Sequence, residues 1–189
     1  MQSRSQLCSS IHPATATPAQ GQVHAMTVLI DRVDDAVRDA GGWMCDRVWA
    51  GWDVTAWVPY GRDITPLRIL GVSVRLLDER SDIWPGPRPA AVAIGNDLTP
   101  LPHRIRTKLD ALMRNPGTDV TVWGERRPTP GDRFHDVQHR LSAAAIAFKT
   151  QALHAASMPG PCGPTEYFRS YTRWQPLHAV PDTQRSTGS

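Results

Sequence analysis

The 189-residue chain is predicted to fold as a small, three-layer, Rossmann-like α/β domain with a mostly parallel sheet of about four strands. Short apolar or alternating runs at 53–58, 72–77, 90–94 and 119–123 are typical of strands. Stretches with helical periodicity separate most of these runs, and parallel neighbours require such crossover connections. With 40% hydrophobic and 21% charged residues, the composition suits one globular domain.

The first 25 residues are rich in Ser, Thr, Ala, Pro and Gln, and we interpret them as a disordered leader. Patterned sequence begins at Met26, so an alternative is that translation starts there; an intact mass of the native protein distinguishes the two. Apolar residues then recur at helical spacing, which predicts a helix over 27–40 that ends at Gly41 and Gly42.

The middle of the chain alternates between strand and helix patterns. Residues 43–49 are expected to form a short helical turn, and strand 53–58 follows it. The sequence around Pro66 resembles a helix start, and Gly71 ends that helix. Strand 72–77 is apolar on both sides, which favours substantial burial.

A proline-rich loop over 82–89 precedes strand 90–94. Apolar spacing predicts a helix over 102–114, then strand 119–123, then the longest helix over 134–156. We therefore expect a domain over 26–158. The tail, 159–189, is expected to dock through a short aromatic segment and to be mostly flexible.

Composition excludes several classes of protein. The three cysteines, Cys8, Cys45 and Cys162, are far apart and form no CxxC pair, which favours reduced thiols and a cytoplasmic location. No apolar run approaches the length of a membrane span, so no membrane partner is expected. The net charge of +3 has no long basic run to focus it, so nucleic-acid binding is not the first expectation.

Acidic side chains follow several of the predicted strands. In open parallel sheets, ligands bind beyond the carboxyl ends of the strands. Asp63, Asp97 and Glu125 are therefore the catalytic candidates, and together they could hold a Mg²⁺ ion or share a proton. The simpler interpretation is that they cap turns through local hydrogen bonds.

Glycine fingerprints for nucleotides are absent, since the chain has neither GxGxxG nor GxxxxGK[ST]. His103, Arg104 and Arg106 are candidates for a weaker anion site, because they stand at a predicted helix start where free N–H groups attract anions. The alternative is an ordinary solvated surface.

His135 and His139 stand four residues apart in a predicted helix, which is the spacing of an HExxH zinc helix. The glutamate that should follow the first histidine is replaced by Asp136, and no third ligand is evident. Surface or capping histidines are the simpler interpretation, and no cofactor is expected.

The chain has seven tryptophans, and Trp is enriched at interaction hot spots, so exposed ones are candidates for contact with a partner. Trp84, in the proline-rich loop, and Trp174, in the tail, are the candidates for exposed contact.

The leading hypothesis is a non-catalytic regulatory or protein-interaction module whose partner is an unidentified protein or small effector. The alternative is a metal-assisted hydrolase or phosphotransfer enzyme with carboxylates at strand ends, so whether the chain is an enzyme stays open. The third hypothesis is weak nucleic-acid binding through a set of basic residues: Arg104, Arg106, Lys108, Arg126, Arg127, Arg133 and Arg140.

Overall fold

The computed structural model describes residues 24–84, 87–95, 101–114, 117–124 and 134–171. Within them, a seven-stranded sheet runs in the order β3-β2-β1-β4-β5-β7-β6. The strands are β1 (Ala25–Leu29), β2 (Asp53–Pro59), β3 (Ser73–Leu77), β4 (Ala91–Gly95), β5 (Asp119–Trp123), β6 (His135–Arg140) and β7 (Thr165–Ser170).

Five neighbouring strands of this sheet, from β3 to β5, are parallel. At the far side, β7 pairs antiparallel with both β5 and β6. The predicted α/β class is confirmed, but the sheet is larger than the expected four strands and is mixed. Because the order reverses between β1 and β4, the carboxyl ends of these two strands form the crevice in which doubly wound folds bind ligands.

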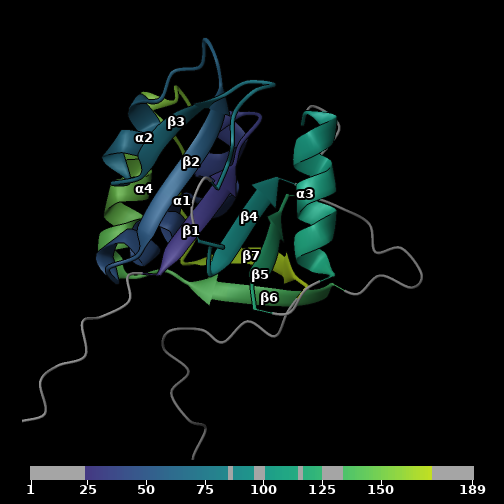
Figure 1. Ribbon diagram of the computed structural model, residues 1–189. Coiled ribbons are helices and arrows are strands. Elements are labelled where there is room, and N and C mark those ends of the chain that lie inside the picture. Colours follow the sequence, from purple (N-terminus) through teal and green to yellow (C-terminus); the bar gives the residue numbers. More distant parts are fainter. Residues whose placement is uncertain (1–23, 85–86, 96–100, 115–116, 125–133, 172–189) are drawn as a thin grey trace, which may run out of the picture.

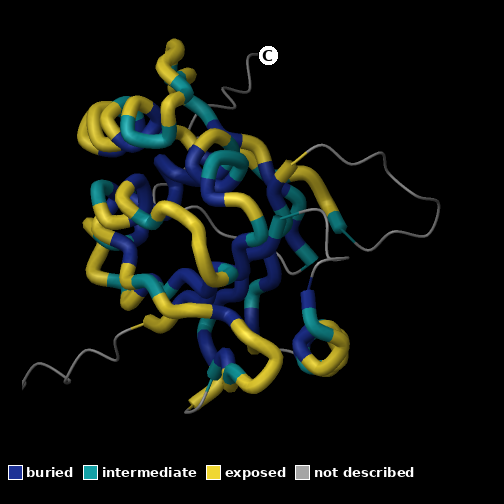
Figure 2. Tube along the Cα trace, turned by 90° about the horizontal axis from the view of Figure 1, so that it is seen from above, coloured by how far each residue is buried: buried dark blue, intermediate teal, exposed yellow. Residues whose placement is uncertain are grey.

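Helices cover both faces of the sheet (Figure 1). On one face lie α1 (Val33–Trp49), α2 (Thr65–Ile69) and α4 (Ala143–Ala155), which pack against one another; on the other lies α3 (His103–Met113). Two apolar clusters fill the layers between helices and sheet, one around Trp43 and Met44 and the other around Ile94 and Ile105. Figure 2 shows the result as a buried interior beneath exposed outer turns.

The predicted helix over 27–40 is wrong in its first part. Residues 25–29 form β1, a central strand that pairs with β2 and β4, and the helix begins only at Val33. A strand buried on both faces is a continuous apolar run, which periodicity does not separate from a helix.

Gly41 and Gly42 do not end α1, which continues to Trp49. Inside the helix, both glycines face side chains of other elements that lie close to it. A Cβ atom on Gly42 would lie 2.5 Å from Leu141 Cδ1, and one on Gly41 would lie 3.3 Å from Leu70 Cδ1. The glycines are therefore packing residues rather than a helix stop.

The predicted helix over 134–156 is wrong in its first part. Residues His135–Arg140 form β6, and α4 begins after the N-cap residue Ser142, whose Oγ accepts a hydrogen bond from the Ala145 amide at 3.0 Å. Strand β3 also differs from expectation, since it lies at the sheet edge and its Leu76 is exposed. No helix in the described part of the chain is both long and apolar enough to cross a membrane.

Candidate active site

A pocket of about 820 Å³ opens at the carboxyl ends of β1, β4 and β5. Asp31 and Arg32 follow β1, while Gly95 and Trp123 end β4 and β5. The opposite wall comes from α1, α4 and the segment that leads into β7. The pocket therefore lies at the crevice beside the reversal of strand order, where the topology predicts a ligand.

One wall of the pocket is apolar and another is charged. The apolar wall contains Leu29, Ile94, Leu101, Trp123 and Leu153. Besides Lys149 and Glu166, the charged groups come from the start of α1 and the two residues before it, and they are Asp31, Arg32, Asp35, Arg38 and Asp39. Such a combination can hold an organic group against the apolar wall while polar chemistry takes place beside it.

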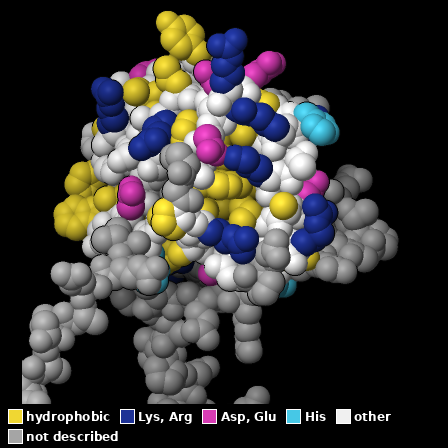
Figure 3. All heavy atoms as spheres, viewed as in Figure 1, with side chains coloured by type: hydrophobic (Ala, Val, Ile, Leu, Met, Phe, Trp, Pro, Cys, Tyr) yellow, Lys and Arg dark blue, Asp and Glu magenta, His cyan; other side chains and the backbone are white. Residues whose placement is uncertain are grey.

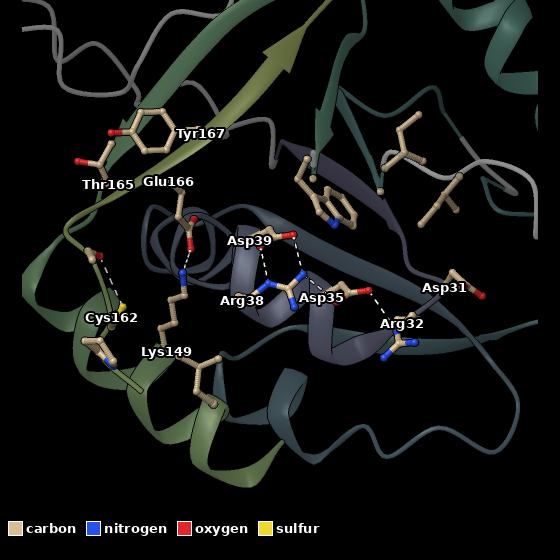
Figure 4. Close-up of a pocket in the computed structure, with 18 of the residues that line it drawn as sticks. Asp31, Arg32, Asp35, Arg38, Asp39, Lys149, Cys162, Thr165, Glu166 and Tyr167 are labelled. Atoms are coloured by element: carbon tan, nitrogen blue, oxygen red, sulfur yellow. Dashed lines mark hydrogen bonds and ion pairs between the residues drawn. The ribbon is translucent and has the colours of Figure 1, made fainter. Parts of the chain in front are cut away.

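The charged side chains of α1 form a continuous series of ion pairs (Figure 4). Arg32 Nε lies 3.1 Å from Asp35 Oδ2, and Arg38 Nη2 lies 2.8 Å from Asp35 Oδ1. Arg38 Nε also donates to Asp39 Oδ1 at 2.9 Å. The hydrogen bond to Asp39 and the charge of both carboxylates raise the pKa of the Arg38 guanidinium, so Arg38 stays charged.

Asp31 differs from its neighbours. It follows the central strand β1 and lines the same pocket, but within the described part of the chain its carboxylate has no hydrogen bond or ion pair. A carboxylate with free lone pairs at a strand end can accept a proton from a bound water molecule.

A buried ion pair forms the inner wall of the pocket. Lys149 Nζ on α4 donates to Glu166 Oε1 on β7 at 2.6 Å, and both side chains are almost fully buried. The Glu166 carboxylate also accepts the backbone N–H groups of Gly42 at 2.9 Å and Trp43 at 2.8 Å. Burial raises the pKa of Glu166, although the Lys149 charge opposes this rise. The pair thus joins three elements, α1, α4 and β7.

Cys162 lies near this pair at the edge of the pocket (Figure 4), and its Sγ contacts the Gly163 carbonyl oxygen at 3.6 Å. Burial raises the pKa of the Cys162 thiol. The thiol is therefore protonated at neutral pH and is not an activated nucleophile.

The carboxylates proposed from sequence do not define this pocket. Asp63 lies away from it, at the start of α2, where its Oδ1 accepts the Thr65 amide at 2.9 Å. That hydrogen bond lowers the pKa of Asp63, as expected of a turn-capping residue. Asp97 and Glu125 lie outside the described residues, so their roles stay predictions.

The histidine pair does not have the geometry of a zinc helix. His135 and His139 lie on strand β6, and residues four apart on a strand are separated by about 13 Å, too far to share one ion. His139 instead lies 2.8 Å from Asp46 Oδ2, through Nε2. Among the described residues, no three His, Cys, Asp or Glu side chains are grouped so that they could hold a metal.

The other sequence candidates lie on α3 and near it. His103, Arg104 and Arg106 occupy the first turn of α3, as predicted, and Arg104 donates to the Ser81 carbonyl oxygen at 2.5 Å. Trp84 is half-buried, with Lys108 Nζ at 5.8 Å from its ring centroid, and Trp174 lies outside the described residues. On the face in Figure 3, Lys and Arg side chains are scattered among acidic ones rather than gathered in one patch.

Sequence reasoning missed Asp31, Lys149 and Glu166. One signal was present for Lys149, which is one of only two lysines and follows Ala145 by one helical turn on the face that carries Leu153. Asp31 directly follows the apolar run 26–30, which was assigned to a helix. Had that run been identified as a strand, the rule of strand ends would have selected Asp31.

No family model and no curated protein matches the chain. Several solved structures match its fold, and two of them have TM-scores above 0.5. The A40926 pseudoaglycone deacetylase Dbv21 is 14% identical with a TM-score of 0.52, and the match covers 79% of this chain and 97% of that one. A deacetylase of teicoplanin biosynthesis, solved with teicoplanin, is 13% identical with a TM-score of 0.51, covering 77% of this chain and 97% of that one.

These neighbours contradict the leading sequence hypothesis. A non-catalytic regulatory or protein-interaction module was expected, whereas the two proteins named above, which share the fold over nearly their whole length, are deacetylases. The hypothesis failed because it relied on the absence of short catalytic motifs, and a site assembled from separate strand ends leaves no such motif. The alternative hypothesis, a metal-assisted hydrolase or phosphotransfer enzyme with carboxylates at strand ends, agrees better with the neighbours in its hydrolase part.

Proposed function

We propose that this protein is a hydrolase that removes an acyl group from an amide, with its site in the pocket at the ends of β1, β4 and β5. The observation that carries the proposal is the position of the Asp31 carboxylate in this pocket, at the end of the central strand and without a partner among the described residues. The deacetylase activity of the proteins with this fold supports the choice of reaction.

The reaction needs a base, a stabilised oxyanion and a proton for the leaving group. Asp31 accepts a proton from water as the water oxygen attacks the carbonyl carbon. The carbonyl oxygen becomes negative in the tetrahedral intermediate, and the neighbouring guanidinium groups of Arg32 and Arg38 stabilise that charge. The C–N bond then breaks, Asp31 returns the proton to the amine, and a carboxylic acid and an amine leave.

The donor set does not fit a metal ion. No group of three suitable ligands occurs among the described residues, and the carboxylates of Asp35 and Asp39 are already bound to arginine. The proposed hydrolysis therefore uses only protein side chains and water.

The apolar wall supports a substrate with an organic acyl or aromatic part. Leu29, Ile94 and Trp123 offer a surface that an alkyl or ring group can cover, while the amide lies at the charged side.

The test is release of primary amine from a panel of N-acylated amines, with teicoplanin and A40926 pseudoaglycone included. Wild-type protein is expected to release amine, and Asp31→Asn is expected to lower kcat by roughly 100-fold or more, because the amide cannot accept the proton. Asp110→Asn, on the exposed face of α3, is the matched control and should retain full activity. No release from any substrate, or full activity in Asp31→Asn, would overturn the proposal.

A further inference from the structure

Hydrolases with carboxylate-rich sites commonly use a metal ion to polarise the carbonyl group or activate water. In this pocket the positive charges are already present in the protein. Arg32 and Arg38 are held beside the acidic side chains of α1, in the order Arg32, Asp35, Arg38 and Asp39 along the series of ion pairs.

The ion pairs use the oxygen atoms that a metal would need. Asp35 Oδ2 faces Arg32 Nε and Asp35 Oδ1 faces Arg38 Nη2. Asp39 Oδ1 accepts from Arg38 Nε at 2.9 Å, and Asp39 Oδ2 accepts from Arg38 Nη2 at 3.3 Å. All four oxygens of these two carboxylates thus contact a guanidinium group. A divalent cation would have to displace both arginines and would be repelled by them.

The same arginines retain donors for a ligand. A guanidinium carries five N–H groups, and Arg38 directs those of Nε and Nη2 toward Asp35 and Asp39. The two N–H groups on Nη1 have no partner among the described residues and stay available to a negatively charged oxygen in the pocket. Asp35 and Asp39 therefore hold Arg38 in position without using up its capacity to bind.

We infer that this pocket works without a metal ion, and that Arg32 and Arg38 supply the positive charge a metal would provide, with Asp35 and Asp39 as their positioning residues. The catalytic part of this inference rests on the proposed hydrolase function. The part about metal binding does not, because it concerns the occupancy of the carboxylate oxygens.

The experiment measures metal binding by calorimetry with tag-free, full-length protein dialysed against chelator, titrated with Zn²⁺ and separately with Mg²⁺. In the wild type, neither Zn²⁺ nor Mg²⁺ is expected to bind at Asp35, so the Asp35→Asn variant should give the same titration curves. In the double variant Arg32→Gln/Arg38→Gln the carboxylates lose their partners, and affinity for Zn²⁺ is expected to rise by about tenfold or more. Adding Asp35→Asn to that double variant should abolish the gain.

One equivalent of Zn²⁺ or Mg²⁺ bound by the wild type and lost in Asp35→Asn would overturn the inference. Binding that survives Asp35→Asn lies elsewhere, for example on surface histidines, and supports a metal-free pocket. Failure of the double variant to gain affinity would overturn the claim that the arginines exclude a cation.

The activity assay distinguishes this inference from the proposed function. If amine is released, 1,10-phenanthroline and EDTA should leave kcat unchanged, and Arg38→Ala should lower kcat more than it raises KM, because its donors act on the intermediate. Loss of activity in chelator with recovery in Zn²⁺ would overturn the inference while the hydrolase stands. If no amine is released, the hydrolase proposal fails, and calorimetry still decides whether the pocket binds metal.

Discussion

Lys149 and Glu166 form a buried ion pair, Nζ to Oε1 at 2.6 Å, between the middle of α4 and the second residue of β7. Through two further hydrogen bonds from the amides of Gly42 and Trp43, the same carboxylate holds α1. The pair therefore fixes the inner wall of the pocket relative to the start of α1, where the arginines and Asp31 lie.

Glu166→Gln is expected to lower the free energy of unfolding by about 3–5 kcal/mol, because it leaves the Lys149 charge buried without a counter-ion. Urea denaturation followed by circular dichroism measures the change. The double variant Lys149→Met/Glu166→Gln should recover part of the loss, since it removes both charges.

The control is the exposed pair formed by Lys108 Nζ and Asp82 Oδ1 at 2.5 Å. Lys108→Met should cost at most about 1 kcal/mol, because water screens such pairs. A Glu166→Gln variant no less stable than Lys108→Met would show that the buried pair does not hold the three elements together.

Gly42→Ala is expected to destabilise the protein by roughly 1–3 kcal/mol, because the new Cβ would lie 2.5 Å from Leu141 Cδ1 and 2.6 Å from its Cδ2. Gly41→Ala is the matched control one residue earlier. Its Cβ would be 3.3 Å from Leu70, a smaller displacement that the gain in helix propensity partly offsets. Thermal denaturation of the two variants should rank Gly41→Ala above Gly42→Ala, and the reverse order would contradict the packing argument.

Ser142 caps α4, and its Oγ also donates to Asp46 Oδ1 at 2.6 Å. Ser142→Ala should cost about 1 kcal/mol through loss of the cap. Asn and Asp are equally good caps in general, but Asp at this position places a second carboxylate against Asp46. Ser142→Asp should therefore be less stable than Ser142→Asn at pH 7, with the difference shrinking at pH 4. Equal stability of these two variants at pH 7 would disprove the Asp46 contact.

Cys45 is fully buried in α1, and burial, followed by the charge of Asp46, raises its pKa from 9.0 to about 11. Between these pH values the folded state keeps the thiol proton while the unfolded state has lost it. Stability should consequently fall as pH rises from about 9 toward 11, by up to about 3 kcal/mol over the full range.

Urea titrations between pH 8 and pH 10.5 measure this fall for the wild type and for Cys45→Ala. The alanine variant starts less stable because of the cavity but should lose less stability over this range. Identical pH slopes for the two proteins would refute a raised thiol pKa.

Several elements were predictable because their pattern is local. Strands β2, β4 and β5 and helix α3 were predicted within one or two residues, since each is a short apolar run or an amphipathic repeat bounded by turn residues. Segment 134–156 was harder: β6 is followed closely by α4, and the tertiary pairing of His135–Arg140 with β7 overrides the local pattern.

The candidate site was less predictable than the fold. The rule of strand ends was applied without β1, so Asp31 was missed, and Asp63, chosen because it follows β2, lies away from the pocket. Lys149 and Glu166 are 17 residues apart in sequence, and Gly42 is 124 residues from Glu166. No spacing rule joins positions this far apart.

By itself, the sequence determined the α/β class and most strand positions, because apolar periodicity reports which face of a local segment is buried. Only the tertiary structure decided that 25–29 is the central strand, that α1 continues through Gly41 and Gly42, and that Arg38, Asp31 and the Lys149–Glu166 pair surround one pocket. These features depend on contacts between elements distant in the chain, and local patterns carry no information about which distant surface a residue meets.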